Sequence, residues 1–125
     1  MKTISTLVLL LISLSMMAQT EIKDIEKGKQ LTIKNACTAC HQEYGPLLAP
    51  GFSGIGVINR KAENDQANIV ISEAIAKGSK GQYTHFKDAV MPPYAQLSEK
   101  DRLLIANYIL SLSNGKNQIK PVHKI

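Results

Sequence analysis

The hydrophobic residues of this chain are most concentrated near its start, where an apolar run from Ile4 to Leu14 follows Lys2. The run continues to Ala18, after which the sequence turns polar. A positive residue, a short apolar stretch and a small residue at its end are typical of a secretory signal peptide. An uncleaved membrane anchor is the alternative, but about fourteen apolar residues fall short of the roughly 20 that a spanning helix needs. We therefore expect cleavage after Ala18, which removes residues 1–18 and leaves no stable membrane insertion.

Beyond this run, apolar residues recur at helical spacing in three segments. The first covers residues 21–35. The second covers residues 66–77 and is followed by Gly78, a residue type that commonly ends a helix. The third covers residues 99–113 and follows Ser98, which opens a capping-box pattern. These segments predict three helices.

Glycine and proline break the pattern between these segments. Residues 42–60 contain four glycines and two prolines, and residues 78–97 contain two of each. Such a density of breakers predicts loops over most of both stretches. A strand is the alternative for residues 69–71, but the helical spacing continues beyond them. The predicted class is therefore all-α.

The composition shows that this helical domain has few aromatic side chains for its core. The 125 residues include two Phe, four Tyr and no Trp. We expect one small domain over residues 19–125, with a core at about 22–113 and a frayed tail at 114–125. A large flat apolar cofactor would supply the buried surface that such side chains lack.

The charge of the chain indicates what kind of partner it meets. The formal net charge of +5 falls by one when Lys2 is removed. The lysines are scattered rather than gathered in a stripe with aromatic residues, which argues against nucleic-acid binding. A modest positive charge suits docking to acidic faces of partner proteins.

The strongest chemical signal is the pentad Cys37-Thr38-Ala39-Cys40-His41. Its C-x-x-C-H spacing is typical of the covalent attachment of c-type haem. One helical turn carries Cys37 and Cys40 on the same face, so both thiols can add to the vinyl groups of a single porphyrin. The adjacent imidazole of His41 is then the proximal ligand of the iron. The sequence therefore predicts one haem c bound through Cys37 and Cys40.

Other roles of a C-x-x-C pair fit this chain less well. A dithiol redox enzyme needs a strand-rich βαβ context, which the helical pattern lacks. A closed zinc site needs four ligands, but beyond the pentad only His85 and His123 offer nitrogen donors and no further cysteine exists. A simple disulfide leaves the contiguous His41 without a role.

Met91 is the only methionine of the chain beyond residue 18. Pro92 and Pro93 follow it, and their fixed φ angles make a rigid segment that could hold a thioether over a haem face. Methionine ligation is typical of electron carriers, whereas a second histidine or an open position is typical of low-potential or gas-binding haems. We therefore expect Met91 to be the second axial ligand. A core-filling role for Met91 and axial ligation by His85 are the alternatives.

Together these features resemble class I cytochromes c, particularly the small bacterial soluble monohaem kind. The resemblance spans nearly all of residues 22–113. It rests on three segments in this order: Gly28-Lys29-Gln30-Leu31 leading to the pentad, Ile75-Ala76-Lys77-Gly78-Ser79-Lys80-Gly81-Gln82-Tyr83, and Met91-Pro92-Pro93 followed by Leu97-Ser98 and the helix to Leu112.

The resemblance implies a cytochrome c fold, with three to five helices wrapped around one covalently bound haem and with the first and last helices crossing. On this basis Gly28 permits a close crossing, and Tyr108 packs beside it. Thr32 stands where the first helix of the family commonly has an aromatic residue, which predicts a less tightly packed crossing.

The resemblance also implies roles for residues around the haem. Pro50 corresponds to a loop proline whose backbone carbonyl orients the His41 imidazole through its second ring nitrogen, and Pro46 is the alternative. Tyr83 corresponds to an aromatic residue that often donates a hydrogen bond to a haem propionate. Ordinary loop packing is the alternative for Tyr83.

These expectations describe a periplasmic one-electron carrier rather than an enzyme, with His41 and Met91 holding an iron that cycles between Fe(II) and Fe(III). Its partners would be redox proteins, a donor and an acceptor such as a terminal oxidase or reductase, and the carrier would be a monomer. A haem-based peroxidase or gas sensor, with His85 or an open sixth site, is the first alternative. A subunit that relays electrons inside a fixed complex is the second.

Overall fold

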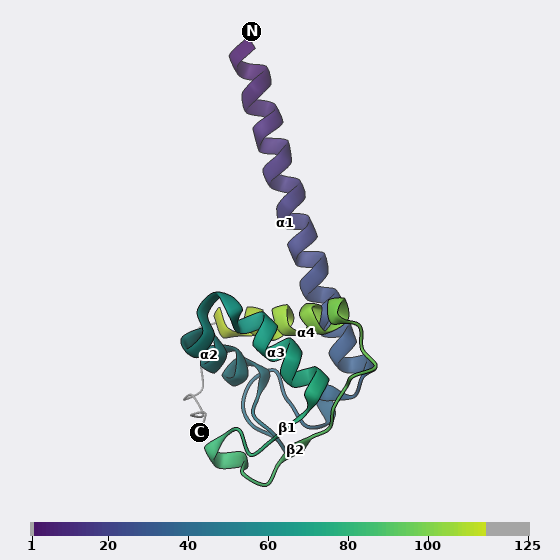
Figure 1. The fold of residues 1–125 in the computed structure, drawn as a ribbon. Helices are drawn as coiled ribbons and strands as arrows, with labels where there is room; N and C mark the ends of the chain where they lie inside the picture. Colours follow the sequence, from purple (N-terminus) through teal and green to yellow (C-terminus); the bar gives the residue numbers. More distant parts are fainter. Residues whose placement is uncertain (1, 115–125) are drawn as a thin grey trace.

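The computed structural model of this protein describes residues 2–114. Within them the chain forms four α-helices, joined by loops and short 3-10 turns, and one antiparallel pair of two-residue strands (Figure 1). The prediction of a mostly helical fold with three to five helices is confirmed. The elements in chain order are α1 (Lys2–Lys34), α2 (Phe52–Glu63), α3 (Ala67–Lys77), β1 (Ser79–Lys80), β2 (Val90–Met91) and α4 (Glu99–Ser111).

Helix α1 is one continuous helix whose first part projects away from the rest of the molecule (Figure 1). The segment expected to be a signal peptide, residues 1–18, lies on this projecting part apart from residue 1, which is outside the described residues. Among residues 2–114 there is no helix long and apolar enough to cross a membrane. Cleavage after Ala18 stays a prediction.

The second part of α1 crosses α4 at close range. A Cβ atom added at Gly28 would lie 2.8 Å from the carbonyl carbon of Leu104 and 2.9 Å from the Cβ of Tyr108. The close crossing at Gly28 beside Tyr108 is therefore confirmed. Thr32 is only 1% exposed, so the crossing excludes solvent at this position, and the expected looser packing stays a prediction. The Thr32 hydroxyl donates a hydrogen bond of 2.7 Å to the carbonyl of Lys29, which satisfies the polar group inside the crossing.

The predicted loop is present over residues 42–51, but the prediction was wrong from Phe52 onward, where α2 begins. Two glycines lie inside this helix, and each costs about 1 kcal/mol relative to alanine. Gly56 is required by packing, since a Cβ there would lie 2.8 Å from the carbonyl oxygen of Ile109 on α4. Burial of Phe52 and Val57 stabilises the helix by more than its glycines cost.

The helices predicted over residues 66–77 and 99–113 are confirmed, with small shifts at their ends. The helix predicted over residues 21–35 is present, but α1 begins much earlier, at Lys2. Ser98 caps α4, and its Oγ accepts a hydrogen bond of 3.1 Å from the backbone N–H of Asp101. Gly78 ends α3 with a φ of 72°, in the region that favours glycine. Residues 69–71 are helical, so the strand alternative is excluded. The predicted tail lies outside the described residues from residue 115 onward.

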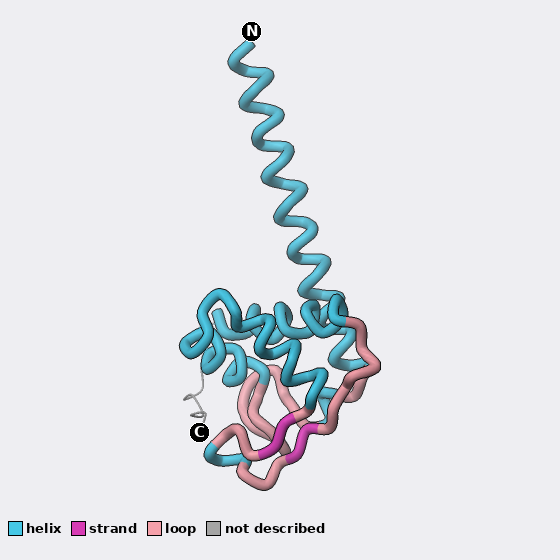
Figure 2. Tube along the Cα trace, in the orientation of Figure 1, coloured by secondary structure: helices cyan, strands magenta, loops and turns pink. Residues whose placement is uncertain are grey.

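The core lies where α2, α3 and α4 meet. Figure 2 shows the two strands and most of the loops gathered on one side of these helices. The segment 78–97 is largely irregular, as predicted, and contains only a short 3-10 turn and the β1–β2 pair. In this pair Ser79 lies opposite Met91 and Lys80 lies opposite Val90. The buried core cluster comprises Phe52, Ala67, Ile71, Ile75, Ile105, Ala106, Tyr108, Ile109 and Leu110.

Candidate functional site

A cleft of about 500 Å³ opens between the helical core, the loop after the pentad and the two strands. Its volume lies in the range of cofactor and small-molecule sites. Apolar side chains of α3 and α4, including Ile71, Ile75 and Ile105, form part of its lining. The structure brings every site residue predicted from the sequence to this one cleft: Cys37, Cys40, His41, Pro50, Tyr83 and Met91.

The pentad begins with a sharp change in chain direction after α1. Ala36 adopts a left-handed conformation with φ 57°, which costs an L-residue roughly 1–2 kcal/mol. A 3-10 turn follows over Cys37–Ala39, and the backbone N–H of His41 donates a hydrogen bond of 3.0 Å to the carbonyl of Cys37. Neither cysteine forms a disulfide, and partial burial raises the pKa of the Cys37 thiol.

The imidazole of His41 is oriented by the loop that follows it. Its Nδ1 lies 2.7 Å from the carbonyl oxygen of Pro50. Because a carbonyl can only accept, Nδ1 carries the proton and donates, and Nε2 keeps its lone pair for a metal. Burial lowers the pKa of His41, and the hydrogen bond to Pro50 opposes this shift. No hydrogen bond joins His41 to Pro46, which is not among the residues that line the cleft.

A phenylalanine that the sequence analysis did not single out packs against this imidazole. Phe52, the first residue of α2, stacks on His41 with ring centroids 5.3 Å apart and an angle of 17° between the planes. The ring of Tyr108 on α4 packs edge-on against Phe52, with ring centroids 6.0 Å apart and an angle of 72° between the planes. The sequence analysis missed Phe52 because its segment was expected to be a loop, where no helix would place a side chain against His41.

Met91 reaches the cleft from β2 and is half-buried. The segment that carries it packs closely on the end of α3. A Cβ added at Gly78 would lie 2.6 Å from the carbonyl oxygen of Met91 and 2.9 Å from the nitrogen of Pro93. The backbone N–H of Tyr94 donates a hydrogen bond of 2.9 Å to the carbonyl of Ile75, which fixes the other end of the segment.

His85, the alternative axial ligand, lies away from the cleft that Met91 lines. It lies in a 3-10 turn between the strands, its side chain is exposed, and it is not among the residues that line the cleft.

Tyr83 shares the cleft with Asn59, another residue that the sequence analysis did not identify. Burial raises the pKa of Tyr83, and a side-chain hydrogen bond to Asn59 partly opposes this shift. Asn59 is only 4% exposed, and its Nδ2 donates a hydrogen bond of 2.9 Å to the carbonyl of Ile55 within α2. Together they place two polar side chains in a largely apolar cleft.

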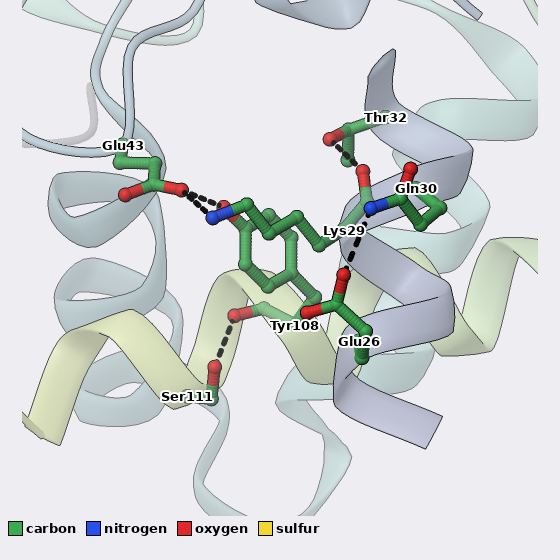
Figure 3. A network of polar contacts seen from close by, with 7 residues as sticks. All are labelled: Glu26, Lys29, Gln30, Thr32, Glu43, Tyr108 and Ser111. Atoms are coloured by element: carbon green, nitrogen blue, oxygen red, sulfur yellow. Dashed lines mark hydrogen bonds and ion pairs between the residues drawn. The ribbon is translucent and has the colours of Figure 1, made fainter. Parts of the chain in front are cut away.

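A polar network ties the loop after the pentad to the crossing of α1 and α4 (Figure 3). The hydroxyl of Tyr108 donates a hydrogen bond of 2.6 Å to Oε1 of Glu43, and Nζ of Lys29 lies 3.0 Å from the same oxygen. The hydrogen bond from Tyr108 lowers the pKa of Glu43 the most, and the hydrogen bond from Lys29 lowers it further. Nothing in the local sequence marked Glu43, because its partners are distant along the chain.

The residues present fit a covalently bound haem. Two cysteines on one turn, neither of them in a disulfide, line a largely apolar cleft beside an imidazole whose Nε2 is available. The zinc alternative lacks ligands, since no group of three or more His, Cys, Asp or Glu side chains suited to a metal ion occurs in the described part of the chain. Fold and cleft together define a small helical haem-binding protein.

Comparison with known proteins identifies the family. The cytochrome c family model matches residues 25–113. Cytochrome c-552 of Nitrosomonas europaea is 32% identical over 82 residues, which cover 66% of this chain and 75% of that protein. The crystal structure of wild-type Nitrosomonas europaea cytochrome c552 matches with a TM-score of 0.57 at 31% identity, covering 67% of this chain and 98% of that one. A deletion mutant of the same cytochrome matches with a TM-score of 0.56, at the same identity and coverage.

The chain therefore belongs to the cytochrome c family. Its cofactor is haem c, attached covalently through Cys37 and Cys40. Its family is one of electron carriers rather than enzymes, and its partners are redox proteins.

Proposed function

We propose that this protein is a periplasmic one-electron carrier whose haem iron is held by His41 and Met91 and shuttles electrons between respiratory redox partners. The single observation that supports this most is that His41 and Met91 line the same cleft as the two thiols. When bound, the haem supplies the one-electron chemistry. The role of the chain is to hold both axial ligands in the same geometry in both oxidation states.

The two proposed ligands are supported by different contacts. On the His41 side, the hydrogen bond from Nδ1 to Pro50 fixes the tautomer and makes Nε2 a better donor. On the Met91 side, close packing on Gly78 restricts the movement of the segment. Thioether ligation raises the reduction potential. With both axial positions filled by protein, no open site is left for a substrate.

Tyr83 has a proposed role at the polar part of the cleft. Its hydroxyl would donate a hydrogen bond to a haem propionate, and the buried Asn59 would orient it. The desolvation that raises the pKa of Tyr83 keeps it a neutral donor near a carboxylate at ordinary pH.

The location and partners are also proposals. Cleavage after Ala18 would leave residues 19–125 in the periplasm as a monomer with a net positive charge. That charge suits docking to acidic faces of a donor and an acceptor, such as a terminal oxidase or reductase. Mass spectrometry of the exported protein should give the mass of residues 19–125 plus one haem, and gel filtration should give a monomer. A full-length mass or a stable oligomer would contradict these points.

Optical spectroscopy of oxidised and reduced protein tests the axial ligands. We expect a low-spin haem with the methionine-to-iron band near the red end of the oxidised spectrum. Met91→Ala should lose this band, lower the reduction potential and let the reduced protein bind carbon monoxide. His85→Ala is the matched control and should change none of these. An unchanged potential in Met91→Ala, or loss of the low-spin spectrum in His85→Ala, would instead favour the peroxidase or gas-sensor alternative.

A further inference from the structure

The imidazole of His41 is held on its face as well as at its edge. The hydrogen bond to Pro50 acts at Nδ1. Phe52 covers a face of the ring at a centroid distance of 5.3 Å and nearly parallel to it. These two contacts restrain different motions. A hydrogen bond tolerates tens of degrees of misalignment before it weakens steeply, whereas turning an imidazole against a stacked ring drives its edge into that ring.

Phe52 has little freedom to follow such a movement. It is 3% exposed, and its backbone N–H donates a hydrogen bond of 2.8 Å to the carbonyl of Gln42, in the same loop as His41. Tyr108, which is 4% exposed, packs edge-on against its ring. Aromatic pairs of this geometry contribute beyond the area that they bury. Phe52 is therefore fixed relative to the loop by its backbone and relative to α4 by its side chain.

Tyr108 is in turn fixed by the loop that carries the imidazole. Its hydroxyl donates to Oε1 of Glu43, which also pairs with Lys29 of α1 (Figure 3). The carbonyl of Glu43 accepts a hydrogen bond of 3.0 Å from the backbone N–H of Ser53, next to Phe52. The contacts thus form a closed ring from His41 through Phe52 and Tyr108 to Glu43 and back along the chain.

We propose that Phe52 is a positioning residue that sets the rotation of the His41 imidazole about its bond to the iron, and that Tyr108 and Glu43 hold Phe52 in place. This inference rests on the proposed function, because it requires His41 to be an axial ligand. The plane of an axial imidazole selects the iron orbital that holds the unpaired electron in the low-spin oxidised state. Phe52 would therefore control how spin density is distributed around the haem.

Proton NMR of the oxidised holoprotein reads this distribution directly, because the four haem methyl groups shift according to the spin density at each. Phe52→Leu keeps an apolar side chain and removes the flat face, so we expect the order or the spread of the four methyl shifts to change. Val57→Ala is the matched control, since Val57 is buried on the same helix but does not line the cleft. It should destabilise the protein and leave the methyl shifts as in the wild type.

Tyr108→Phe provides a second variant in case Phe52→Leu does not retain haem. It keeps the ring that packs on Phe52 and removes only the hydroxyl bound to Glu43, so we expect a smaller change of the methyl shifts in the same sense. Methyl shifts equal to those of the Val57→Ala control in whichever variant folds would overturn the positioning role. A wild-type protein without a low-spin spectrum would instead overturn the proposed function itself, so the two failures are distinguishable.

Discussion

Replacing Gly28 with alanine should destabilise this protein, although alanine is the better helix former. Alanine favours a helix interior over glycine by about 1 kcal/mol. The new methyl group, however, would lie 2.8 Å from the carbonyl carbon of Leu104 and 2.9 Å from the Cβ of Tyr108. Non-bonded carbon atoms pack best at roughly 3.5–4.0 Å, so α1 and α4 must move apart.

The size of the destabilisation by Gly28→Ala depends on which atoms the new methyl group meets. Overpacking costs typically about 1–3 kcal/mol, and the upper end applies because a backbone carbonyl cannot turn away as a long side chain can. After the helix-propensity gain is subtracted, we expect the free energy of unfolding to fall by about 2 kcal/mol. For a domain of this size that lowers the melting temperature by about 10 °C.

Gly54→Ala is the matched control for this experiment. Gly54 also lies inside a helix, but a Cβ there would meet nothing within 4 Å. The same change should therefore stabilise the protein by up to about 1 kcal/mol. Guanidinium denaturation of the two holoproteins, followed by circular dichroism, measures the difference. The reasoning is refuted if Gly28→Ala is as stable as Gly54→Ala.

Three further predictions concern the haem attachment, the last helix and the alkaline limit. Cys37→Ser or Cys40→Ser should lower haem retention, and the double variant should be unfolded by circular dichroism; a well-folded apo double variant would contradict this. Ser98→Ala should lower the free energy of unfolding by about 1 kcal/mol through loss of the N-cap of α4, measured by urea denaturation, and no change would mean that this cap is not needed. Because burial raises the pKa of Tyr83 above that of the unfolded chain, the native state binds more protons above about pH 10, and stability should fall as pH rises from there. Tyr83→Phe should flatten this fall, and an unchanged slope of stability against pH would contradict the assignment.

The parts of the site found from the sequence are those marked by spacing along the chain. The pentad lies on one turn, and Met91 is followed directly by two prolines, so both were recognisable locally. Their meeting in one cleft was implied by the resemblance to a family. The position of His85 outside the cleft could not be read from its six-residue distance to Met91.

The residues that sequence reasoning missed act through contacts between distant segments. Glu43 pairs with Tyr108 across 65 positions of the chain, and no local pattern signals such a pair. Helix α2 was missed for a related reason. Its glycines looked like breakers, yet Gly56 is there because the backbone of Ile109 approaches it. Local propensity does not reveal what will pack against a residue, so Phe52 and Asn59 were hidden within an expected loop.

The contact between α1 and α4 also bears on the order in which folding and haem attachment take place. Gly28 and Leu104 are far apart in the sequence, so their contact closes a long loop and cannot form until α4 is present. Before this contact forms, we expect the chain to be open and the two thiols to be accessible for haem attachment. We expect thioether formation to precede folding, with the completed carboxyl-terminal helix closing the chain around a group that is already bonded to it.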